Sequence, residues 1–419
     1  MKIVDLKVVI GANFGDEGKG LVTDSLCRQI KQLSPNETII NVLSNGGAQR
    51  GHTVKESYLN GGRRHVFHHF GSGTMAGAIT YMSADFIVNP LIFVKELEEL
   101  REMGFNPIGY INETARLSTP YDMILNQLLE SLREEKHGSC GCGIYETILR
   151  SDRQHHLLDV AWWFSYLDTR DITEDIRDKL LDHMFTRLHE EGYTIDDIPQ
   201  ETKDIIFSNN LWENFLSDLQ IMKKWVNKNS QLFREAINSP TIHLVVENAQ
   251  GLLLDTDIDE VHSTPTNTGF KEIIRLCEKD LIFHQLFREI KFCIEIYYVS
   301  RTYLTRHGDG PFDDMTDSEY FRNIKDFTNI PNEYQGSIRY SLLDYDELLD
   351  RMYKDISSSD IVTFINGYKK YMRQILVFTH VNEMDMHMIP IISKGEKVHH
   401  LNNFSHEYIS RNDYSMVSK

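Results

Sequence analysis

The sequence predicts an α/β fold with a single large, mostly parallel central sheet, flanking helices and a helical insertion. Two early segments support this prediction. The apolar run at 4–10 leads into the glycine-rich stretch "GANFGDEGKG" and then into helical spacing, and "TIINVLS" leads into a second glycine-rich loop, "NGGAQRGHTV". Strand-like runs return at 241–255, 292–312 and 374–385. This alternation is typical of a parallel sheet that binds ligands beyond the carboxyl ends of its strands.

The stretch at about 155–240 has a different pattern, which predicts the helical insertion. Within "EDIRDKLLDHMFTRLHEE", apolar residues recur every three or four positions and share one helical face: Ile176, Leu180, Leu181, Met184 and Leu188. We find neither internal repeats nor a low-complexity linker. We therefore expect residues 1–419 to form one domain that carries this insertion.

Composition limits the classes of partner and compartment. The chain has 419 residues, of which 41% are hydrophobic, and its net charge is −18. Such an acidic surface argues against broad binding to nucleic acid or to anionic membranes. No apolar stretch approaches the roughly 20 residues that span a bilayer. The five cysteines are odd in number, and no signal-peptide pattern opens the chain, so we expect a reduced, cytoplasmic protein.

The first glycine-rich loop has the features of a phosphate-binding loop. Gly15, Gly18 and Gly20 surround Lys19 between a strand and a helix, an arrangement that can hold phosphates on backbone N–H groups. The spacing differs from the G-x-x-x-x-G-K-[ST] pattern, because Lys19 is followed by glycine. From these residues alone, a P-loop-like nucleotide site and a turn with a solvated lysine both stay open.

Two carboxylates in the same loop favour chemistry over simple binding. Asp16 and Glu17 would repel a phosphate unless a divalent cation lies between them or unless one of them transfers a proton. The second loop supplies His52, which can donate or accept a proton near neutral pH. A carboxylate base and a histidine acid on two glycine-rich loops suit the activation of an oxygen toward a phosphoryl group.

These motifs together resemble the adenylosuccinate synthetase family. "GANFGDEGKG", "GGAQRGHTV", "VVENAQGLLLDTD", "STPTNT" and "TYLTRHGDGPF" occur in the family's order from residue 3 to about 385. The resemblance implies a homodimeric ligase of purine biosynthesis. It would join L-aspartate to a 6-oxopurine nucleoside monophosphate, normally IMP, using a nucleoside triphosphate, normally GTP, and Mg²⁺. The 6-oxygen is phosphorylated and is then displaced by the aspartate amine.

The resemblance also implies roles for individual residues. Asp16 is the base that takes the N1 proton, and it would bind Mg²⁺ together with the Gly51 carbonyl. His52 is the acid, and Lys19 and Gln250 complete the catalytic set. Donor-nucleotide contacts fall on Gly15, Glu17, Gly18, Lys19, Gly20, His380 and Asn382. Purine-nucleotide contacts fall on Asn13, Gln49, Ser139, Cys140, Arg150, Gln250 and Thr264, and Arg150 matches an arginine that reaches across the dimer. Aspartate contacts fall on Arg339, Ser337 and Arg306.

Departures from the family pattern leave the substrates open. In "THVNEMD", Asn382 replaces a carboxylate that recognises guanine, and His380 replaces a lysine over the base. An amide fits the adenine edge better, which favours ATP or dATP as donor. The same switch is found in a phage branch that acts on dGMP with ATP and makes 2-aminoadenylosuccinate. That branch has serine in place of the catalytic Asp, so Asp16 favours IMP.

Two further departures concern the other ligands. The predicted substrate-phosphate loop, "HGSCGCGIYETILR", has Ser139, Cys140 and Cys142 in place of threonines, and we interpret the cysteines as small packing residues. The family's arginine-rich aspartate loop is reduced to "YQGSIRYSLLD". This loss leaves open a third function, a purine nucleotide sensor without ligase activity.

Overall fold

The computed structural model describes most of the chain up to residue 380 and four short strands beyond it. The described ranges are 3–56, 62–134, 138–153, 159–169, 173–255, 264–288, 294–308, 310–322, 324, 336–357, 372–380, 391–393, 396–398, 407–409 and 416–418. Asn382, a predicted donor-nucleotide contact, lies outside these residues.

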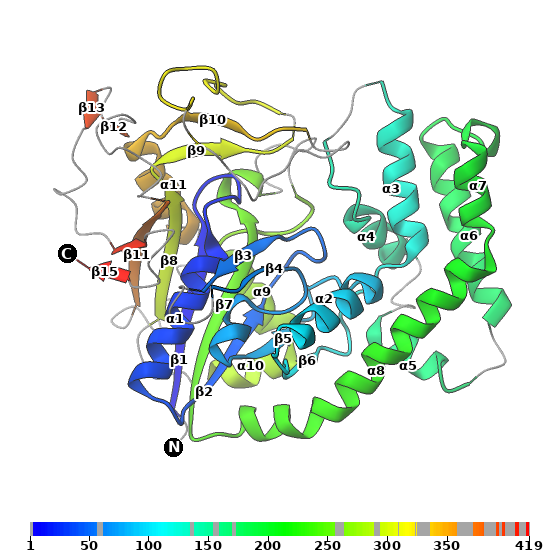
Figure 1. Ribbon diagram of the computed structural model, residues 1–419, viewed down its shortest axis with the longest axis horizontal. Helices are drawn as coiled ribbons and strands as arrows, with labels where there is room; N and C mark the ends of the chain where they lie inside the picture. The colour runs from blue at the N-terminus through cyan, green and yellow to red at the C-terminus, as the bar shows by residue number, and fades with distance from the viewer. Residues whose placement is uncertain are drawn as a thin grey trace.

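The centre of the molecule is a nine-stranded sheet in the order β15-β14-β11-β8-β1-β7-β2-β5-β6 (Figure 1). All pairings are parallel except that of β14 with β15 at one edge. The strands are β1 (Ile3–Gly11), β2 (Thr38–Leu43), β5 (Ile79–Met82), β6 (Gly109–Ile111), β7 (Thr241–Gly251), β8 (Ile294–Arg301), β11 (Met372–Thr379), β14 (Glu407–Ile409) and β15 (Met416–Ser418). The predicted mostly parallel central sheet is confirmed.

The register of β1 explains why its sequence is a continuous apolar run. Val8 lies opposite Val246 of β7 and Ile296 of β8, so this strand is covered on both edges. Alternate residues then point to opposite faces. Val8 packs toward α9 (Lys271–Lys279), α10 (Leu281–Arg288) and α11 (Tyr345–Ser357), and Val9 packs toward α1 (Lys19–Leu33). Strands buried on both faces need such runs.

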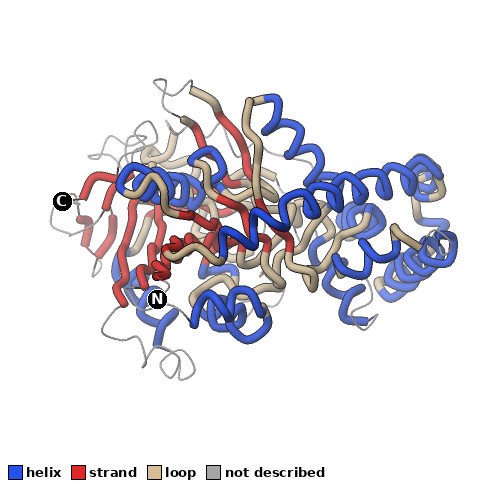
Figure 2. The backbone as a smooth tube through the Cα atoms, turned by 90° about the horizontal axis from the view of Figure 1, so that it is seen from below, coloured by secondary structure: helices blue, strands red, loops and turns tan. Residues whose placement is uncertain are grey.

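The remaining helices form a group beside the β6 edge. They are α2 (Pro90–Glu102), α3 (Pro120–Leu132), α4 (Ile144–Arg153), α5 (Val160–Tyr166), α6 (Thr173–Glu190), α7 (Gln200–Ile206) and α8 (Asn209–Ile237). Figures 1 and 2 show α3 to α7 gathered at the end of the molecule away from β11, with α8 running back toward the sheet. Short 3₁₀ helices span Ser72–Ala76 (η2), Ile195–Asp197 (η3) and Leu252–Leu254 (η4).

One apolar cluster holds this group together. Trp163, Trp212, Phe215 and Trp225 are buried in it, and the face predicted at 176–188 contributes to the same cluster. Helices α5 to α8 follow β6 and precede β7 in the chain. The assignment of residues 1–419 to one domain with an insertion stays a prediction.

Three two-stranded ribbons complete the fold. They pair β3 (His52–Lys55) with β4 (Arg64–Phe67), β9 (Tyr303–Arg306) with β10 (Arg339–Leu342), and β12 (Ile391–Ser393) with β13 (Glu396–Val398). Strand β3 of the first ribbon begins at His52, and strand β9 of the second ribbon ends at Arg306. Both ribbons therefore place predicted site residues near the carboxyl ends of the sheet strands (Figure 1).

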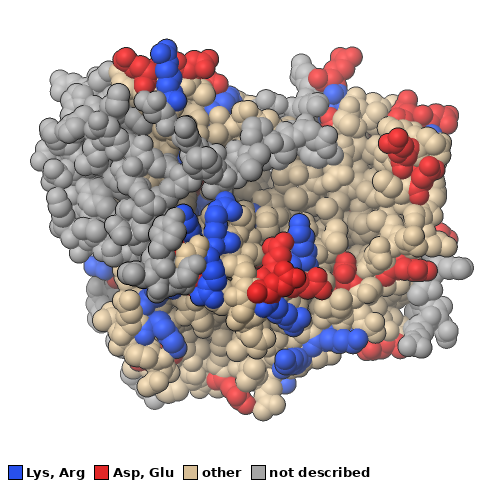
Figure 3. Space-filling model, in the orientation of Figure 1, with Lys and Arg blue, Asp and Glu red and all other residues tan. Residues whose placement is uncertain are grey.

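Figure 3 shows the charged side chains of the described residues on one face of the molecule. On the face drawn in Figure 3, Lys and Arg side chains lie beside Asp and Glu side chains, without a continuous basic surface among the described residues. Among those residues, no helix is both long enough and apolar enough to cross a bilayer.

Candidate active site

The first glycine-rich loop, residues 11–18, is folded around the Glu17 carboxylate. Glu17 Oε1 accepts hydrogen bonds from the backbone N–H groups of Asn13 (3.0 Å) and Gly15 (2.7 Å). Lys19 Nζ donates to the Gly15 carbonyl (2.5 Å) and lies 3.4 Å from Glu17 Oε2. Both charged side chains are buried. Glu17, which we predicted to contact the donor nucleotide, therefore uses its carboxylate inside the loop, and its contact with the donor stays a prediction.

Neighbouring elements hold this loop from outside. The Asn13 side chain donates to Ser300 Oγ (2.9 Å) and accepts from Arg351 Nη2 (2.7 Å). Arg301 Nε donates to the backbone carbonyl of Asp16 (2.7 Å). The Asp16 carboxylate is thus carried on a backbone fixed by β8. Asn13, predicted to contact the purine nucleotide, has its amide engaged by two protein groups.

The end of β7 lies directly against this loop. Gly15 has φ +108°, and a Cβ there would lie 3.2 Å from Gln250 Cα, so only glycine suits both the backbone and the space. Gln250 itself has φ 62°, which is uncommon for a residue with a side chain. Such strain is often found at functional sites. The structure therefore brings the predicted catalytic residue Gln250 beside the loop that carries Asp16 and leads into Lys19 at the start of α1.

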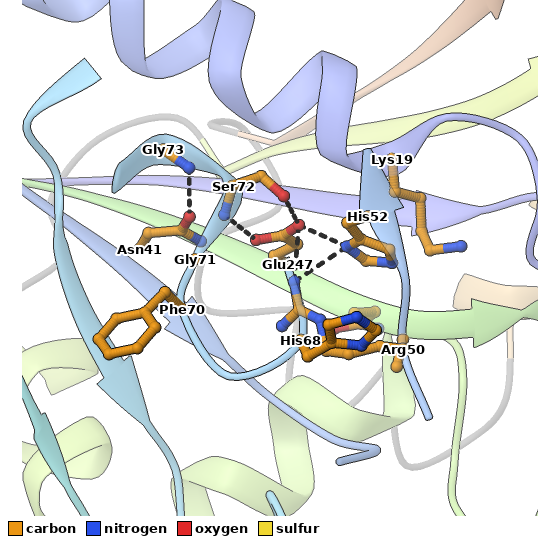
Figure 4. A network of polar contacts seen from close by, with 12 residues as sticks. Lys19, Asn41, Arg50, His52, His68, Phe70, Gly71, Ser72, Gly73 and Glu247 are labelled. Atoms are coloured by element: carbon orange, nitrogen blue, oxygen red, sulfur yellow. Dashed lines mark hydrogen bonds and ion pairs between the residues drawn. The ribbon is translucent and has the colours of Figure 1, made fainter. Parts of the chain in front are cut away.

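His52 begins β3 and is held by a buried polar network (Figure 4). Its Nδ1 lies 2.5 Å from Glu247 Oε1, and Arg50 Nη2 lies 2.8 Å from the same oxygen. Ser72 donates to both Glu247 oxygens, from its hydroxyl and from its backbone N–H (3.1 Å). Glu247, at 0% exposure, thus connects three segments of the chain: residues 50–52, Ser72 and its own strand β7.

Burial and neighbouring charges set the protonation of this network. Burial and the Arg50 guanidinium lower the pKa of His52 to about 4. Burial raises the pKa of Glu247, but Arg50, His52 and Ser72 outweigh it and hold that pKa well below its usual range. Near neutral pH, the unliganded protein therefore has a neutral imidazole beside an ionised carboxylate. His52 Nδ1 lies 2.5 Å from this carboxylate, which only accepts hydrogen bonds, and 2.9 Å from Arg50 Nη2, which only donates them.

The two glycine-rich loops meet at the start of α1. A Cβ on Gly20 would lie 2.8 Å from His52 Cβ and 2.8 Å from Ser72 Oγ. The absence of a side chain at Gly20 therefore lets the helix approach His52. In Figure 4, Lys19 and Glu247 lie on opposite sides of the His52 ring.

Gln49 and Thr264, two predicted purine-nucleotide contacts, lie next to the same strand ends. Gln49 is partly buried, and its Oε1 is shielded from water with no partner among the described residues. The Thr264 hydroxyl lies 3.3 Å from that of Thr266. Gln49 Oε1 is thus a buried acceptor without a partner among the described residues, and its contact with a purine nucleotide stays a prediction.

His380 lies beside the first glycine-rich loop, and its predicted contact with the donor nucleotide stays a prediction. It follows β11 with φ 57°, and a Cβ on Gly18 would lie 3.1 Å from His380 Cε1. Thr379 Oγ1 donates to the backbone carbonyl of Glu17 and ties β11 to this loop. Asn382, the other predicted base contact, is outside the described residues.

The predicted substrate-phosphate loop lies between α3 and α4. Ser139 Oγ accepts from Asn126 Nδ2 (3.0 Å). Cys140 and Cys142 are free thiols, and both are only partly buried, which differs from the packing role that we expected. A hydrogen bond from Cys142 lowers the pKa of Cys140.

Arg150, the predicted purine-nucleotide contact on α4, is bound by groups of its own chain. Its guanidinium is buried at 1% exposure, and it binds Asp122 through two hydrogen bonds of 2.8 and 2.9 Å. It also donates to the Leu117 carbonyl (2.7 Å). The guanidinium is thus engaged within its own chain, and the predicted contact of Arg150 with a purine nucleotide stays a prediction.

The predicted aspartate-binding residues meet on the β9–β10 ribbon. Arg306 lies directly opposite Arg339 in the register, and Ser337 is exposed nearby. Arg339 Nη2 donates to the Gly308 carbonyl (2.6 Å), and the Arg306 guanidinium lies 4.8 Å from the Phe14 ring centroid. Through Phe14 this ribbon contacts the first glycine-rich loop, so two guanidinium groups lie near the predicted site.

Sequence reasoning missed the residues that hold the site residues in place. These residues are Arg50, Ser72, Glu247 and Arg351, which bind His52, Glu247 or the first loop. Glu247 had a usable signal, because this lone carboxylate directly follows the run "TIHLVV" in a segment that the sequence predicts to be a strand. Charged residues are rarely buried without a partner, so its position indicates a polar network.

Comparison with known proteins identifies the family. Residues 8–339 match the sequence profile of adenylosuccinate synthetase, which covers most of the chain. The chain belongs to the adenylosuccinate synthetase family. Among its curated relatives, the adenylosuccinate synthetase of Halothermothrix orenii is 27% identical over 332 residues, which are 76% of this chain and 67% of that protein. The enzyme of Borrelia turicatae is 26% identical over 61% of this chain, and the match spans 53% of that relative. The chain thus spans about half to two thirds of these family members.

Solved structures of the family share the fold. Adenylosuccinate synthetase from Plasmodium falciparum, solved fully ligated, matches with a TM-score of 0.62 at 18% identity, covering 94% of this chain and 82% of that one. Succinoaminodeoxyadenylate synthetase of cyanophage S-2L, solved with dGMP and dATP, matches with a TM-score of 0.52 at 11% identity. That match covers 91% of this chain and 86% of the phage protein.

Proposed function

We propose that this family member is a carbon–nitrogen ligase that joins L-aspartate to C6 of a 6-oxopurine nucleoside monophosphate. The observation that supports this most is the convergence of three segments far apart in sequence. The loop carrying Asp16 and Lys19 packs against Gln250, and the start of α1 packs against His52. A base, a histidine and a phosphate-binding lysine at one sheet edge are the groups that phosphorylation of O6 requires.

The proposed reaction has two steps. Asp16 takes the proton from N1 of the purine, and O6 attacks the γ-phosphorus, so that the nucleoside diphosphate leaves. The aspartate amine then attacks C6, and phosphate leaves. His52 is neutral in the unliganded protein because its pKa is lowered to about 4. The negative charge of a bound triphosphate favours the imidazolium that the acid role needs.

The residues proposed as metal ligands suit Mg²⁺. Asp16 offers a carboxylate that is only partly buried, and Gly51 offers a backbone carbonyl on an exposed residue. Mg²⁺ binds through oxygen atoms, commonly one or two carboxylates together with substrate phosphates. When bound, it would supply positive charge that stabilises the transferred phosphoryl group.

The aspartate substrate is proposed to bind near the β9–β10 ribbon. Arg306 and Arg339 are neighbours across that ribbon, with the exposed Ser337 close in sequence. A guanidinium binds a carboxylate with two parallel hydrogen bonds. We also propose, from the family alone, a cytoplasmic homodimer.

An alternative acceptor and donor pair is dGMP or GMP with ATP or dATP. The observation that favours it is His380, which lies beside Gly18 where the family has a lysine over the guanine base. Asp16 favours IMP, as the sequence indicated. The two possibilities share the reaction and differ in the purine that binds.

A matrix of assays tests the proposal. Purified protein with Mg²⁺ and L-aspartate would be given IMP, GMP or dGMP against GTP, ATP or dATP, with detection of phosphate and of the succinyl nucleotide by mass. We expect turnover with IMP and an adenine donor. Turnover with a guanine acceptor alone would support the alternative. Nucleotide binding without turnover in any combination would overturn the ligase proposal in favour of a sensor.

A further inference from the structure

We infer that Glu247 is the positioning residue of His52: it selects the Nδ1–H form of the ring and directs Nε2 away from β7, toward the side of Lys19. Figure 4 shows the ring between the Glu247 carboxylate and Lys19. The consequence for catalysis rests on the proposed ligase function. The arrangement itself rests only on contacts within this chain.

The backbone under Glu247 is rigid. Glu247 lies opposite Val9 of β1 and Leu43 of β2, so its strand is hydrogen-bonded on both sides near the centre of the sheet. A carboxylate on such a strand has a defined position relative to the first loop, which follows β1. His52, in contrast, begins a two-stranded ribbon. It therefore gains most from an external partner that fixes its orientation.

The carboxylate is held by three donors besides the histidine. Arg50 Nη2 lies 2.8 Å from Oε1, the Ser72 hydroxyl also donates to Oε1, and the Ser72 backbone N–H donates to Oε2 (3.1 Å). Arg50 and Glu247 are buried at 1% and 0% side-chain exposure. With both oxygens bound, the carboxylate cannot rotate without losing hydrogen bonds.

The hydrogen-bond partners of His52 then indicate which ring nitrogen carries the proton. Nδ1 lies 2.5 Å from Glu247 Oε1, which only accepts, and 2.9 Å from Arg50 Nη2, which only donates. The shorter contact with the ionised carboxylate favours the proton on Nδ1. Nε2 is left for a ligand. This arrangement has the logic of a histidine oriented by a buried carboxylate, in which loss of the carboxylate permits the wrong tautomer.

The first experiment measures the tautomer directly. Nitrogen-15 spectra of the ligand-free protein, assigned with His52→Asn, should show His52 protonated on Nδ1. Glu247→Gln preserves the size of the side chain but also presents an amide donor, so we expect a mixture of tautomers. A wild-type ring protonated on Nε2 would overturn the inference.

The second experiment separates positioning from folding through kcat and KM. We expect Glu247→Gln to lower kcat about 100-fold, within the range that general acid–base catalysis contributes, with the KM values within about threefold. Glu247→Asp restores the acceptor on a shorter side chain and should recover part of kcat. Glu96→Gln is the matched control. Glu96 is also buried and accepts from the backbone N–H groups of His68 (3.0 Å) and Phe70 (3.3 Å), but it does not touch His52.

A second variant keeps the test decisive if Glu247→Gln does not fold. Ser72→Ala removes only the hydroxyl donor and should lower kcat about tenfold, as loss of an outer hydrogen-bond partner does. A wild-type kcat in Glu247→Gln would contradict the inference and leave the ligase proposal intact. If Glu247→Gln does not fold, a wild-type kcat in Ser72→Ala would have the same meaning. If the wild-type protein shows no turnover, the ligase proposal fails, and the tautomer measurement still tests Glu247.

Discussion

Charged networks occur at both ends of the parallel sheet, and they differ in their contact with water. At the carboxyl end, the side chains of Arg50, His52 and Glu247 are at most 8% exposed. At the amino end, Lys7 lies 2.7 Å from Asp5 and 2.9 Å from Glu295, with exposures of 14, 24 and 13%. The strands are the same, but the loops that cover the carboxyl end exclude water from its charges.

This difference in burial indicates whether each network serves mainly stability or the orientation of a site residue. Removing two charges from water costs several kcal/mol per ion, and their attraction repays this only with excellent geometry. A network that is partly hydrated is cheaper to form and contributes modestly to stability. The fully buried network at the carboxyl end is therefore poorly explained by stability alone. It is better explained by the orientation of His52. Substitutions at the two ends should separate the two roles.

The largest expected effect is on turnover at the carboxyl end. His52→Asn should lower kcat by about 10²- to 10⁴-fold, the usual contribution of a general acid or base. Nucleotide affinity, measured by calorimetry, should stay within about threefold. His243→Asn is the matched control at the amino end and should retain kcat. Equal loss in both variants would contradict the comparison.

The largest effect on stability is expected at Arg50. Arg50→Met leaves the Glu247 carboxylate buried without its cation, which should lower the free energy of unfolding by about 3–5 kcal/mol. Urea denaturation would measure it. Reversal in the double variant with Glu247→Met, which removes both charges, would show that the unpaired carboxylate is the cause. A loss below about 1 kcal/mol would mean that water reaches Glu247.

The contact between α1 and His52 gives a prediction of unusual sign. Glycine to alanine within a helix ordinarily raises stability by about 1 kcal/mol. At Gly20 the added Cβ would lie 2.8 Å from His52 Cβ and Ser72 Oγ, so Gly20→Ala should instead lower stability by about 1–3 kcal/mol. Thermal unfolding and kcat would both be measured. Increased stability with unchanged kcat would show that α1 can move away from His52 and Ser72 at little cost.

Substitution in the amino-end network should lower stability only slightly, and the loss should become smaller as the salt concentration rises. Lys7→Met removes a cation from two carboxylates and should lower the free energy of unfolding by about 1 kcal/mol at low ionic strength. The loss should shrink in 1 M salt, where the Debye length is about 3 Å. The effect of Arg50→Met should persist there because its pair is buried. Urea denaturation at both ionic strengths checks this difference.

The smallest effect is a pH dependence at His243. Burial lowers the pKa of His243, but hydrogen bonds to Asp5 and Glu37 outweigh it and raise that pKa above its usual 6.5. A raised pKa in the folded state stabilises the protein fully below the unfolded pKa, and the contribution disappears as pH rises through the folded pKa. The advantage of wild type over His243→Asn should therefore be at most about 1 kcal/mol at pH 6 and smaller at pH 9. An advantage that grows with pH would contradict this sign.

The sequence revealed the elements with local signals. Apolar runs followed by glycines predicted β1, β2 and the loops after them, and helical spacing predicted the buried face at 176–188. The contacts between loops that are distant in the sequence could not be predicted in the same way. That Gly15 touches Gln250 and that Gly20 touches His52 follows from sheet order, since β7 lies between β1 and β2. Strand order is not encoded in any one local pattern.

Two residues have partners that the sequence alone did not predict, and the cause is the same for both. Arg150 is a predicted ligand contact, and the structure places Asp122, 28 positions away in the sequence, against its guanidinium. Glu247 was passed over because its partners, Arg50 and His52, are nearly 200 positions away. The chemistry of a charged side chain depends on what is opposite it. That information becomes available only when distant segments are placed together.

The sheet order has a consequence for synthesis of the chain. β1 pairs only with β7 and β8 among the described strands, and roughly 230 residues separate its end from the start of β7. At about 5–20 residues per second, β1 leaves the ribosome roughly 10–50 s before its first partner does. During that interval an apolar strand and the loop after it have no place in a sheet, while β2, β5 and β6 can already pair. The site is therefore among the last parts of this protein to assemble, and a nascent chain stalled before residue 241 should bind no nucleotide.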